Sequence, residues 1–149
     1  MGKYSIFISY RRTDAGDKAE HLKDLLDVFY RGRISFDREN ITGKFNSQLI
    51  ERIDSVKDFI LVLDKESLVY SDEAMSKETV SFYNELASLS SEDFSKRINE
   101  LFLTTKIDYV RLEIVRALKR DGLNIIPVVP ERSADYNFAV SGYCFKKCV

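Results

Sequence analysis

Short apolar runs alternate with longer amphipathic stretches along this chain, and the alternation predicts its secondary structure. The short runs are rich in β-branched and aromatic residues, which is typical of buried strands. The predicted strands are Tyr4–Ser9, Ile34–Phe36, Phe59–Leu63 and Asn124–Val129. Pro127 stands inside the last run. Because proline cannot donate to a sheet ladder, this run is predicted to lie at a sheet edge or near a strand end.

Between the first runs, apolar residues recur at the spacing of amphipathic helices. One predicted helix is capped by Asp14 or Asp17, extends to about Tyr30 and is ended by Gly32. The polar segment Asp37–Lys44 has no such period and ends in a Gly-Lys pair, so it predicts a loop before the next helix. The buried sides of the two helices would consist of Ala19, Leu22, Leu26 and Phe29, and of Phe45, Leu49, Ile53 and Val56.

A long stretch, about residues 65–106, separates the third predicted strand from a helix over 108–120. Its apolar residues fit two further helices, so the stretch is predicted to be a helical insertion packed against the domain. The apolar positions are Val80, Tyr83 and Ala87, then Phe94, Ile98, Leu101 and Phe102, and, in the helix over 108–120, Val110, Ile114, Ala117 and Leu118. Strands that alternate with helices, without hairpin turns, predict an α/β fold with an open parallel sheet.

Composition favours one globular domain and excludes several function classes. The 149 residues carry 23 basic and 24 acidic side chains, and this balance gives no bulk attraction to nucleic acid or to an anionic membrane. No apolar run approaches the roughly 20 residues that span a bilayer. The only cysteines, Cys144 and Cys148, form no disulfide framework, which favours a reducing cytoplasm. With His21 as the single histidine, neither a metal site nor Ser-His or Cys-His catalysis is expected.

Four segments, in this order, carry a resemblance to a known family. They are Phe7–Arg12 (FISYRR), Phe36-Asp37 followed by Ile41 and Gly43-Lys44-Phe45, Phe59–Leu63 (FILVL), and Asp108–Val115 (DYVRLEIV). Each segment is weak evidence by itself, but the ordered set with its spacing resembles a TIR domain over most of the chain outside 65–106 and the last dozen residues. The closest likeness is to the NAD-cleaving members, which include bacterial anti-phage effectors of the Thoeris type and the animal enzyme of axon degeneration.

The resemblance implies a flavodoxin-like open parallel sheet of about five strands with helices on both faces, in a single domain over residues 1–149. The chain departs from the family pattern in three places. Tyr109 stands where a Trp-x-x-x-Glu motif has tryptophan, the insertion is longer than in the animal enzyme, and little chain follows Phe138-Ala139-Val140. The C-terminal part is therefore either compact or belongs to a longer protein.

In an open parallel sheet, ligands bind beyond the carboxyl ends of the strands. Ser9–Arg12, Phe36–Lys44 and Asp64 lie at such ends, and the helix that begins near Asp108 would start on the same side. By resemblance, this edge would bind NAD+. The candidate substrate-binding residues are Ser9, Tyr10, Arg11, Arg12, Phe36, Asp37, Gly43, Lys44, Phe45 and Tyr109.

Glu113 is the candidate catalytic residue, because a carboxylate beside the ribose stabilises the positive charge that develops as nicotinamide leaves. The alternative is a solvated helix residue that pairs with Arg116 or Arg120. Alternatives also remain for the binding candidates. Arg11 and Arg12 would contact phosphate oxygens or face solvent. Tyr10 would stack on a base or belong to the core or rim, and Asp37 is expected to cap a loop rather than to act as a second acid.

The resemblance predicts an NAD+ glycohydrolase or cyclase that releases nicotinamide together with ADP-ribose or a cyclic isomer. NAD+ is its substrate, and no metal or separate cofactor is implied. The implied partners are other TIR domains and a downstream protein that senses the product, in anti-phage defence. The main alternative is a non-catalytic TIR interaction module that uses the 37–45 loop. A phospho-acceptor receiver of the same fold is disfavoured, because Arg11-Arg12 stand where it needs an acidic cluster.

Overall fold

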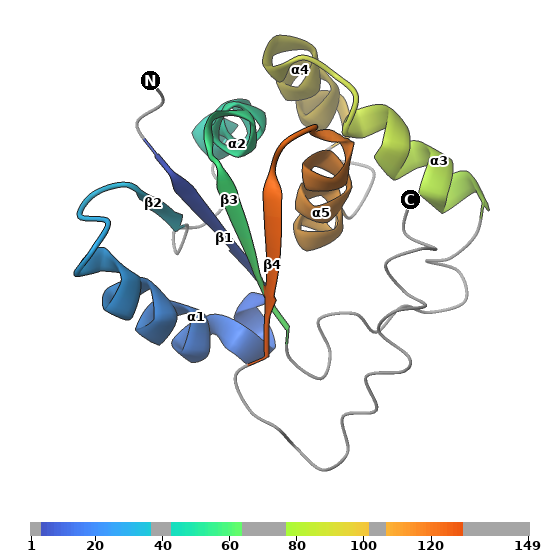
Figure 1. Ribbon diagram of the computed structural model, residues 1–149. Helices are drawn as coiled ribbons and strands as arrows, with labels where there is room; N and C mark the ends of the chain where they lie inside the picture. The colour runs from blue at the N-terminus through green and yellow to red at the C-terminus, as the bar shows by residue number, and fades with distance from the viewer. Residues whose placement is uncertain (1–3, 37–42, 64–76, 102–106, 130–149) are drawn as a thin grey trace.

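The computed structural model describes residues 4–36, 43–63, 77–101 and 107–129 (Figure 1). Four parallel strands form its sheet, in the order β2-β1-β3-β4. This order is the beginning of the flavodoxin-like arrangement, so the predicted fold class is confirmed, with four strands in the described residues where about five were expected. The strands are β1 (Ile6–Tyr10), β2 (Ile34–Phe36), β3 (Asp58–Val62) and β4 (Asn124–Val128).

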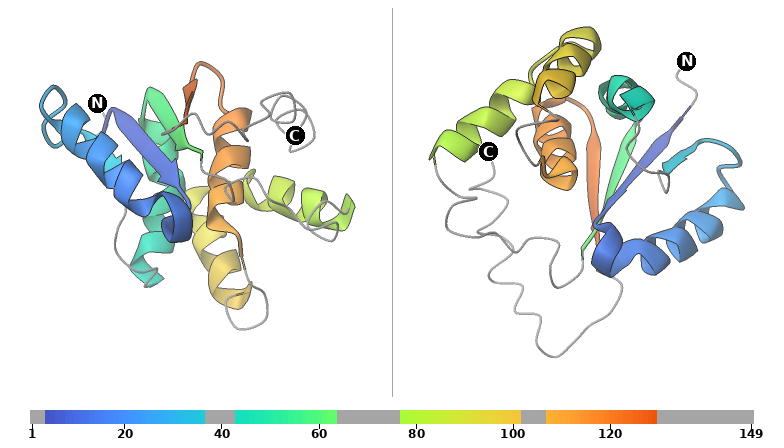
Figure 2. Two further views of the ribbon diagram at one scale, coloured as in Figure 1. Left: turned by 90° about the horizontal axis from the view of Figure 1, so that it is seen from below. Right: turned by 180° about the vertical axis from the view of Figure 1, so that it is seen from behind.

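Helices cover both faces of the sheet, as predicted (Figures 1 and 2). One face packs against α1, and the other against α2 and α5, with α4 beyond α2 and α3 beyond α5. None of the helices in this part of the chain is both long and apolar enough to cross a bilayer. The helices are α1 (Arg12–Asp27), α2 (Gly43–Ser55), α3 (Lys77–Leu86), α4 (Ser91–Leu101) and α5 (Tyr109–Lys119).

The alternation of side chains along β1 divides the core into two parts, because successive residues of a strand point to opposite faces. Ile6, Ile8 and Tyr10 pack on the α1 face. Phe7 points to the opposite face, where its ring stacks on that of Phe59 with centroids 5.5 Å apart. Ser9 follows Phe7 on this second face and is therefore directed toward α5 rather than toward α1.

The structure corrects the predicted limits of the first helix. Asp14 and Asp17 are not its caps: α1 begins at Arg12, directly after β1, and Arg11 occupies the N-cap position without a side-chain cap bond. The helix also ends earlier than predicted, at Asp27, so Phe29 lies beyond it and is 82% exposed instead of buried. Gly32 does not end the helix itself; it lies in the following turn with φ of +66°, a conformation that glycine adopts without strain.

The other predicted elements are present, with ends shifted by one or two residues. Helices α3 and α4 confirm the helical periodicity within 65–106; that this stretch is an insertion relative to the family stays a prediction. α5 is buried more extensively than its predicted stripe, because Leu112 and Val115 are also covered. The reason is that α3 packs against α5, which gives the helix a second buried side.

Pro127 is the last residue but one of β4, which is the outermost strand among the described residues, so its predicted place at a sheet edge or near a strand end is met at the strand end. In a parallel strand, every second residue directs its N–H and C=O toward the same neighbouring strand. On β4, Asn124 and Val128 face β3: Asn124 N–H donates to the Lys57 carbonyl, and the Val128 carbonyl accepts from Leu63 N–H. By that alternation the backbone of Pro127 faces away from β3, so its missing N–H removes no bond from the ladder.

Candidate functional site

An ion pair places the start of α5 at the carboxyl end of β1. Arg11 follows β1 directly, and its Nη2 donates to Asp108 Oδ2 at 2.9 Å across 97 positions of sequence. Asp108 is also the N-cap of α5, because its Oδ1 accepts from the backbone N–H of Arg111 at 3.2 Å. One carboxylate thus starts the helix and attaches it to the sheet.

Glu113 lies one turn into α5 and points back to β1. The Ser9 hydroxyl donates to Glu113 Oε2 at 2.6 Å. Both residues are buried, Glu113 at 8% and Ser9 at 1% exposure, beside the apolar core of this face. Electrostatic interactions of a carboxylate in such surroundings are weakly screened by water and therefore strong.

The arginines that could have paired with Glu113 are engaged elsewhere. Arg116 binds both carboxylate oxygens of Asp54 and the backbone carbonyls of Ala87 and Leu89. Arg120 donates to backbone carbonyls at the end of α2. Since Glu113 is also buried, it is not the solvated, surface-paired helix residue of the alternative interpretation.

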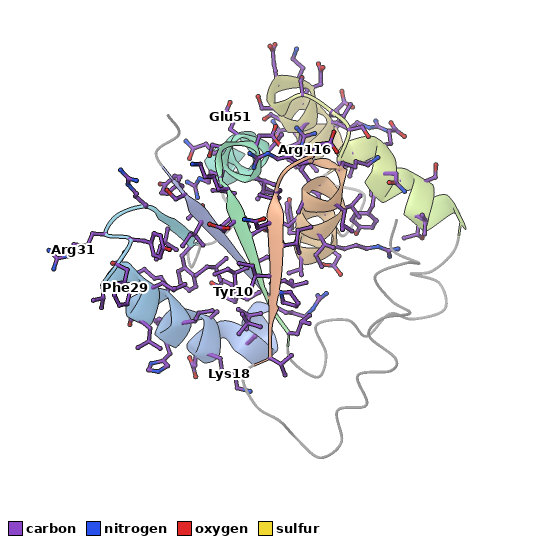
Figure 3. All side chains as sticks on the ribbon, in the orientation of Figure 1. Tyr10, Lys18, Phe29, Arg31, Glu51 and Arg116 are labelled. Atoms are coloured by element: carbon purple, nitrogen blue, oxygen red, sulfur yellow. The ribbon has the colours of Figure 1, made fainter. Side chains whose placement is uncertain are left out.

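Tyr10 and Phe36, two of the candidate substrate-binding residues, lie on the opposite face of the sheet from Glu113. Their rings stack on each other with centroids 5.0 Å apart and planes within 9°. Tyr10 is 8% exposed and belongs to the core between the sheet and α1 (Figure 3). Of the two interpretations of Tyr10, this geometry matches the core aromatic rather than the base-stacking residue.

The remaining candidates are placed only in part. Asp37 lies outside the described residues. Gly43, Lys44 and Phe45 form the first turn of α2, and Arg12 the first residue of α1, with their backbones described but not their side chains. Tyr109 begins α5 and packs, half-buried, against the core shared by α2, α3, α4 and α5. The structure therefore brings together Ser9 and Glu113, with Arg11 nearby at the start of α5.

Two side chains beside this site, Tyr83 and Arg111, make structural contacts that were not predicted from the sequence. Tyr83 of α3 accepts a hydrogen bond from Asp108 N–H at 2.7 Å. The Arg111 guanidinium, 3% exposed, lies 4.9 Å from the centre of the same tyrosine ring, which is a cation–π contact. Burial raises the pKa of the Tyr83 phenol above its ordinary value. The available signal was a tyrosine within a buried stripe, because its hydroxyl must find a partner there.

A cavity of about 580 Å³ lies at the other end of α5, away from Glu113. Its lining is strongly charged, but the guanidinium groups of Arg116 and Arg120 are bound to Asp54 and to backbone carbonyls. Cations at the carboxyl ends of α2 and α5 compensate the partial negative charge of those helix ends. The lining residues are Asp54, Ala87, Ser88, Arg116, Lys119, Arg120 and Asp121.

Comparison with known proteins adds one partial relationship, and no family model matches the chain. Over 65 residues, 42% of this chain, it is 43% identical to the NAD(+) hydrolase tir-1 of Caenorhabditis elegans. The related part is TIR-like. The chain spans only 6% of the length of that relative. The TIR-like relationship agrees with the parallel α/β sheet and its strand order, which are observed independently in the structure.

Proposed function

We propose that this chain is a TIR domain that cleaves the bond between nicotinamide and ribose in NAD+, with Glu113 as the essential carboxylate. The observation that carries the proposal is a buried carboxylate on α5, held by Ser9 next to the carboxyl end of β1. Ligands of open α/β sheets bind at this edge. The partial relationship to an NAD+ hydrolase supports the choice of substrate.

The bond that breaks requires little acid catalysis. Nicotinamide is attached to ribose C1′ as a pyridinium cation, and the bonding electron pair leaves with the ring nitrogen, so nicotinamide departs neutral. An ordinary glycosidase needs a second carboxylic acid to protonate an alkoxide leaving group. For NAD+ that proton is unnecessary, and a single carboxylate is sufficient.

Glu113 would act on the positive charge that develops at the ribose. As the bond lengthens, C1′ and the ring oxygen acquire oxocarbenium character, and a nearby carboxylate stabilises it or holds the ribose hydroxyls. The contact strengthens toward the transition state, which is what raises the rate. Water then adds at C1′ and loses a proton, giving ADP-ribose; attack by a nitrogen of the adenine ring gives a cyclic isomer instead.

The rest of the proposal concerns substrate contacts and biology. Arg11 and Arg12 are proposed for the phosphates, and the Gly43–Phe45 turn and Tyr109 for the mouth of the site. Self-association with other TIR domains, a downstream protein that senses the product, and a role in anti-phage defence in the cytoplasm belong to the same proposal. The self-association, the downstream protein and the defence role follow from the family resemblance alone, and the cytoplasmic location follows from the lack of a disulfide framework.

The test is nicotinamide release from NAD+ by concentrated protein, measured by chromatography for the parent, Glu113→Gln and Glu51→Gln. Glutamine has the shape of glutamate without its charge, so we expect Glu113→Gln to lower kcat about 100-fold or more. Glu51 is an exposed glutamate of α2 (Figure 3). Glu51→Gln makes the same chemical change away from the site and should keep the parent rate.

Two results would count against the proposal. Equal release by the parent and Glu113→Gln would remove Glu113 from the mechanism. No release by the parent, even after the domains are forced together by fusion to an oligomeric scaffold, would favour a non-catalytic interaction module.

A further inference from the structure

We infer that Ser9 is a positioning residue for Glu113 and does not bind substrate directly; this inference rests on the proposed function. The family resemblance suggested a substrate contact for this residue. With 1% of its surface exposed, however, the side chain has no surface to offer a ligand. Its hydroxyl is donated to the carboxylate instead.

The neighbours of Ser9 along β1 and on β3 are apolar. Ser9 lies in β1, between β2 and β3, and pairs in register with Leu61. Its neighbours on the same face, Phe7, Phe59 and Leu61, are all buried. A hydroxyl in such a place costs free energy unless it is hydrogen-bonded. The bond to Glu113 is the contact that accounts for a serine here.

A second link fixes the helix that carries Glu113. Arg11 is two residues after Ser9, and its guanidinium binds Asp108 at the start of α5. The carboxyl end of β1 therefore contacts α5 twice, once at the N-cap and once at Glu113 one turn later. The first contact places the helix, and the second places the carboxylate on it.

This arrangement has a consequence for the rate rather than for binding. A hydrogen bond donated to a carboxylate restricts its rotamers and so fixes the position from which the carboxylate can stabilise an oxocarbenium ion. Loss of the bond leaves Glu113 present but less well oriented. Misplacement of a catalytic group by even one ångström lowers kcat strongly, whereas ground-state binding of NAD+ through other groups is little affected.

Threonine and valine at position 9 isolate the hydroxyl, because the two side chains have nearly the same shape and differ only in that valine has a methyl group where threonine has the hydroxyl. We expect Ser9→Thr to stay within about threefold of the parent kcat. Ser9→Val should lose about 10- to 100-fold in kcat with KM changed by less than about threefold, as expected for a hydrogen bond to a charged group.

The control is Ser35→Val. Ser35 is a buried serine on β2, 3% exposed, on the same face of the sheet, and its hydroxyl has no hydrogen-bond partner among the described residues. The same substitution there should leave kcat within about twofold of the parent, since no hydrogen bond is lost. Circular dichroism and thermal melting verify that every variant is folded.

The outcomes separate this inference from the proposed function. Equal kcat for folded Ser9→Thr and Ser9→Val, with an active parent and an inactive Glu113→Gln, overturns the positioning role and leaves the proposed function intact. A rise in KM alone in Ser9→Val also overturns it, because that result identifies a substrate contact. An inactive parent, or a fully active Glu113→Gln, overturns the proposed function and this inference with it.

Discussion

Buried polar side chains form the specific contacts around α5. Among the described residues, Ser9, Ser35, Arg111 and Glu113 are the buried polar or charged ones. Two of them lie on α5 and a third is bonded to it. Ser9 and Glu113 have lost contact with water and are hydrogen-bonded to each other, so a change at one of them should be felt at the other.

Tyr83 provides a prediction about pH. Burial raises the pKa of its phenol in the folded protein above the value of about 10 in the unfolded chain. The folded state therefore keeps the proton to higher pH than the unfolded state. The stabilisation is fully present below about pH 10 and is lost as pH rises through the folded-state pKa.

Tyr83→Phe removes this titration and the acceptor for Asp108 N–H. We expect it to cost about 1 kcal/mol of unfolding free energy at pH 8, and to flatten the loss of stability between pH 8 and pH 10.5. Urea denaturation at the two pH values measures both effects. An equal loss of stability with pH in the parent and in Tyr83→Phe would show that the phenol does not titrate differently in the two states.

At the scale of elements, α5 depends on its first turn. The helix has 11 residues, which is short for a helix to be stable by itself. Asp108 caps it, binds Arg11 of the β1 end and donates its N–H to Tyr83 of α3. The start of α5 is thereby attached to both the sheet and a neighbouring helix, and this determines where Glu113 lies.

Two substitutions at Asp108 separate the cap from the ion pair. Asp108→Asn keeps a side-chain oxygen for the cap but loses the charge, and we expect it to cost less than about 1 kcal/mol because the pair with Arg11 is partly exposed. Asp108→Ala removes both and should cost about 1–2 kcal/mol. Urea denaturation measures the difference. If alanine and asparagine are equally stable, the cap contributes nothing.

At the scale of the whole molecule, the sheet separates two cores of unequal size. The larger lies between the sheet and α2–α5, and the smaller beneath α1. Phe59 is fully covered in the larger core, whereas Phe29 stands at the end of α1 and is 82% exposed (Figure 3). The same residue type thus occupies the two extremes of burial.

Phe59→Ala should cost about 3–5 kcal/mol, because it leaves a cavity and ends the stacking with Phe7. Phe29→Ala should stay within about 0.5 kcal/mol of the parent, as surface changes generally do. Denaturant unfolding of both variants tests the arrangement of the cores. A large loss for Phe29→Ala in a dilute, monomeric sample would contradict the position of this residue.

The sequence by itself determined the class of fold and the order of its elements. The apolar run Phe59–Leu63 indicates a buried strand directly, and Pro127 indicates the end of one, since both signals depend on local chemistry and period. The ends of helices were harder to predict from the sequence. Asp14 and Asp17 are residue types that commonly cap helices, but α1 starts earlier, because only Arg11 separates its first residue, Arg12, from β1. At this position the short connection between β1 and α1, and not the preference of aspartate for helix caps, determines where the helix starts.

Only the tertiary structure decided which side chains meet. Helix periodicity placed Glu113 at the edge of an apolar stripe and by itself favoured a solvated residue that pairs with Arg116 or Arg120; only the resemblance favoured a buried, catalytic carboxylate. The distinction came from residues far away in sequence: Asp54 and two carbonyls hold Arg116, and Ser9 holds Glu113. Such partners are chosen by the packing of α5 against β1 and α2, a long-range arrangement that no local pattern of residues encodes.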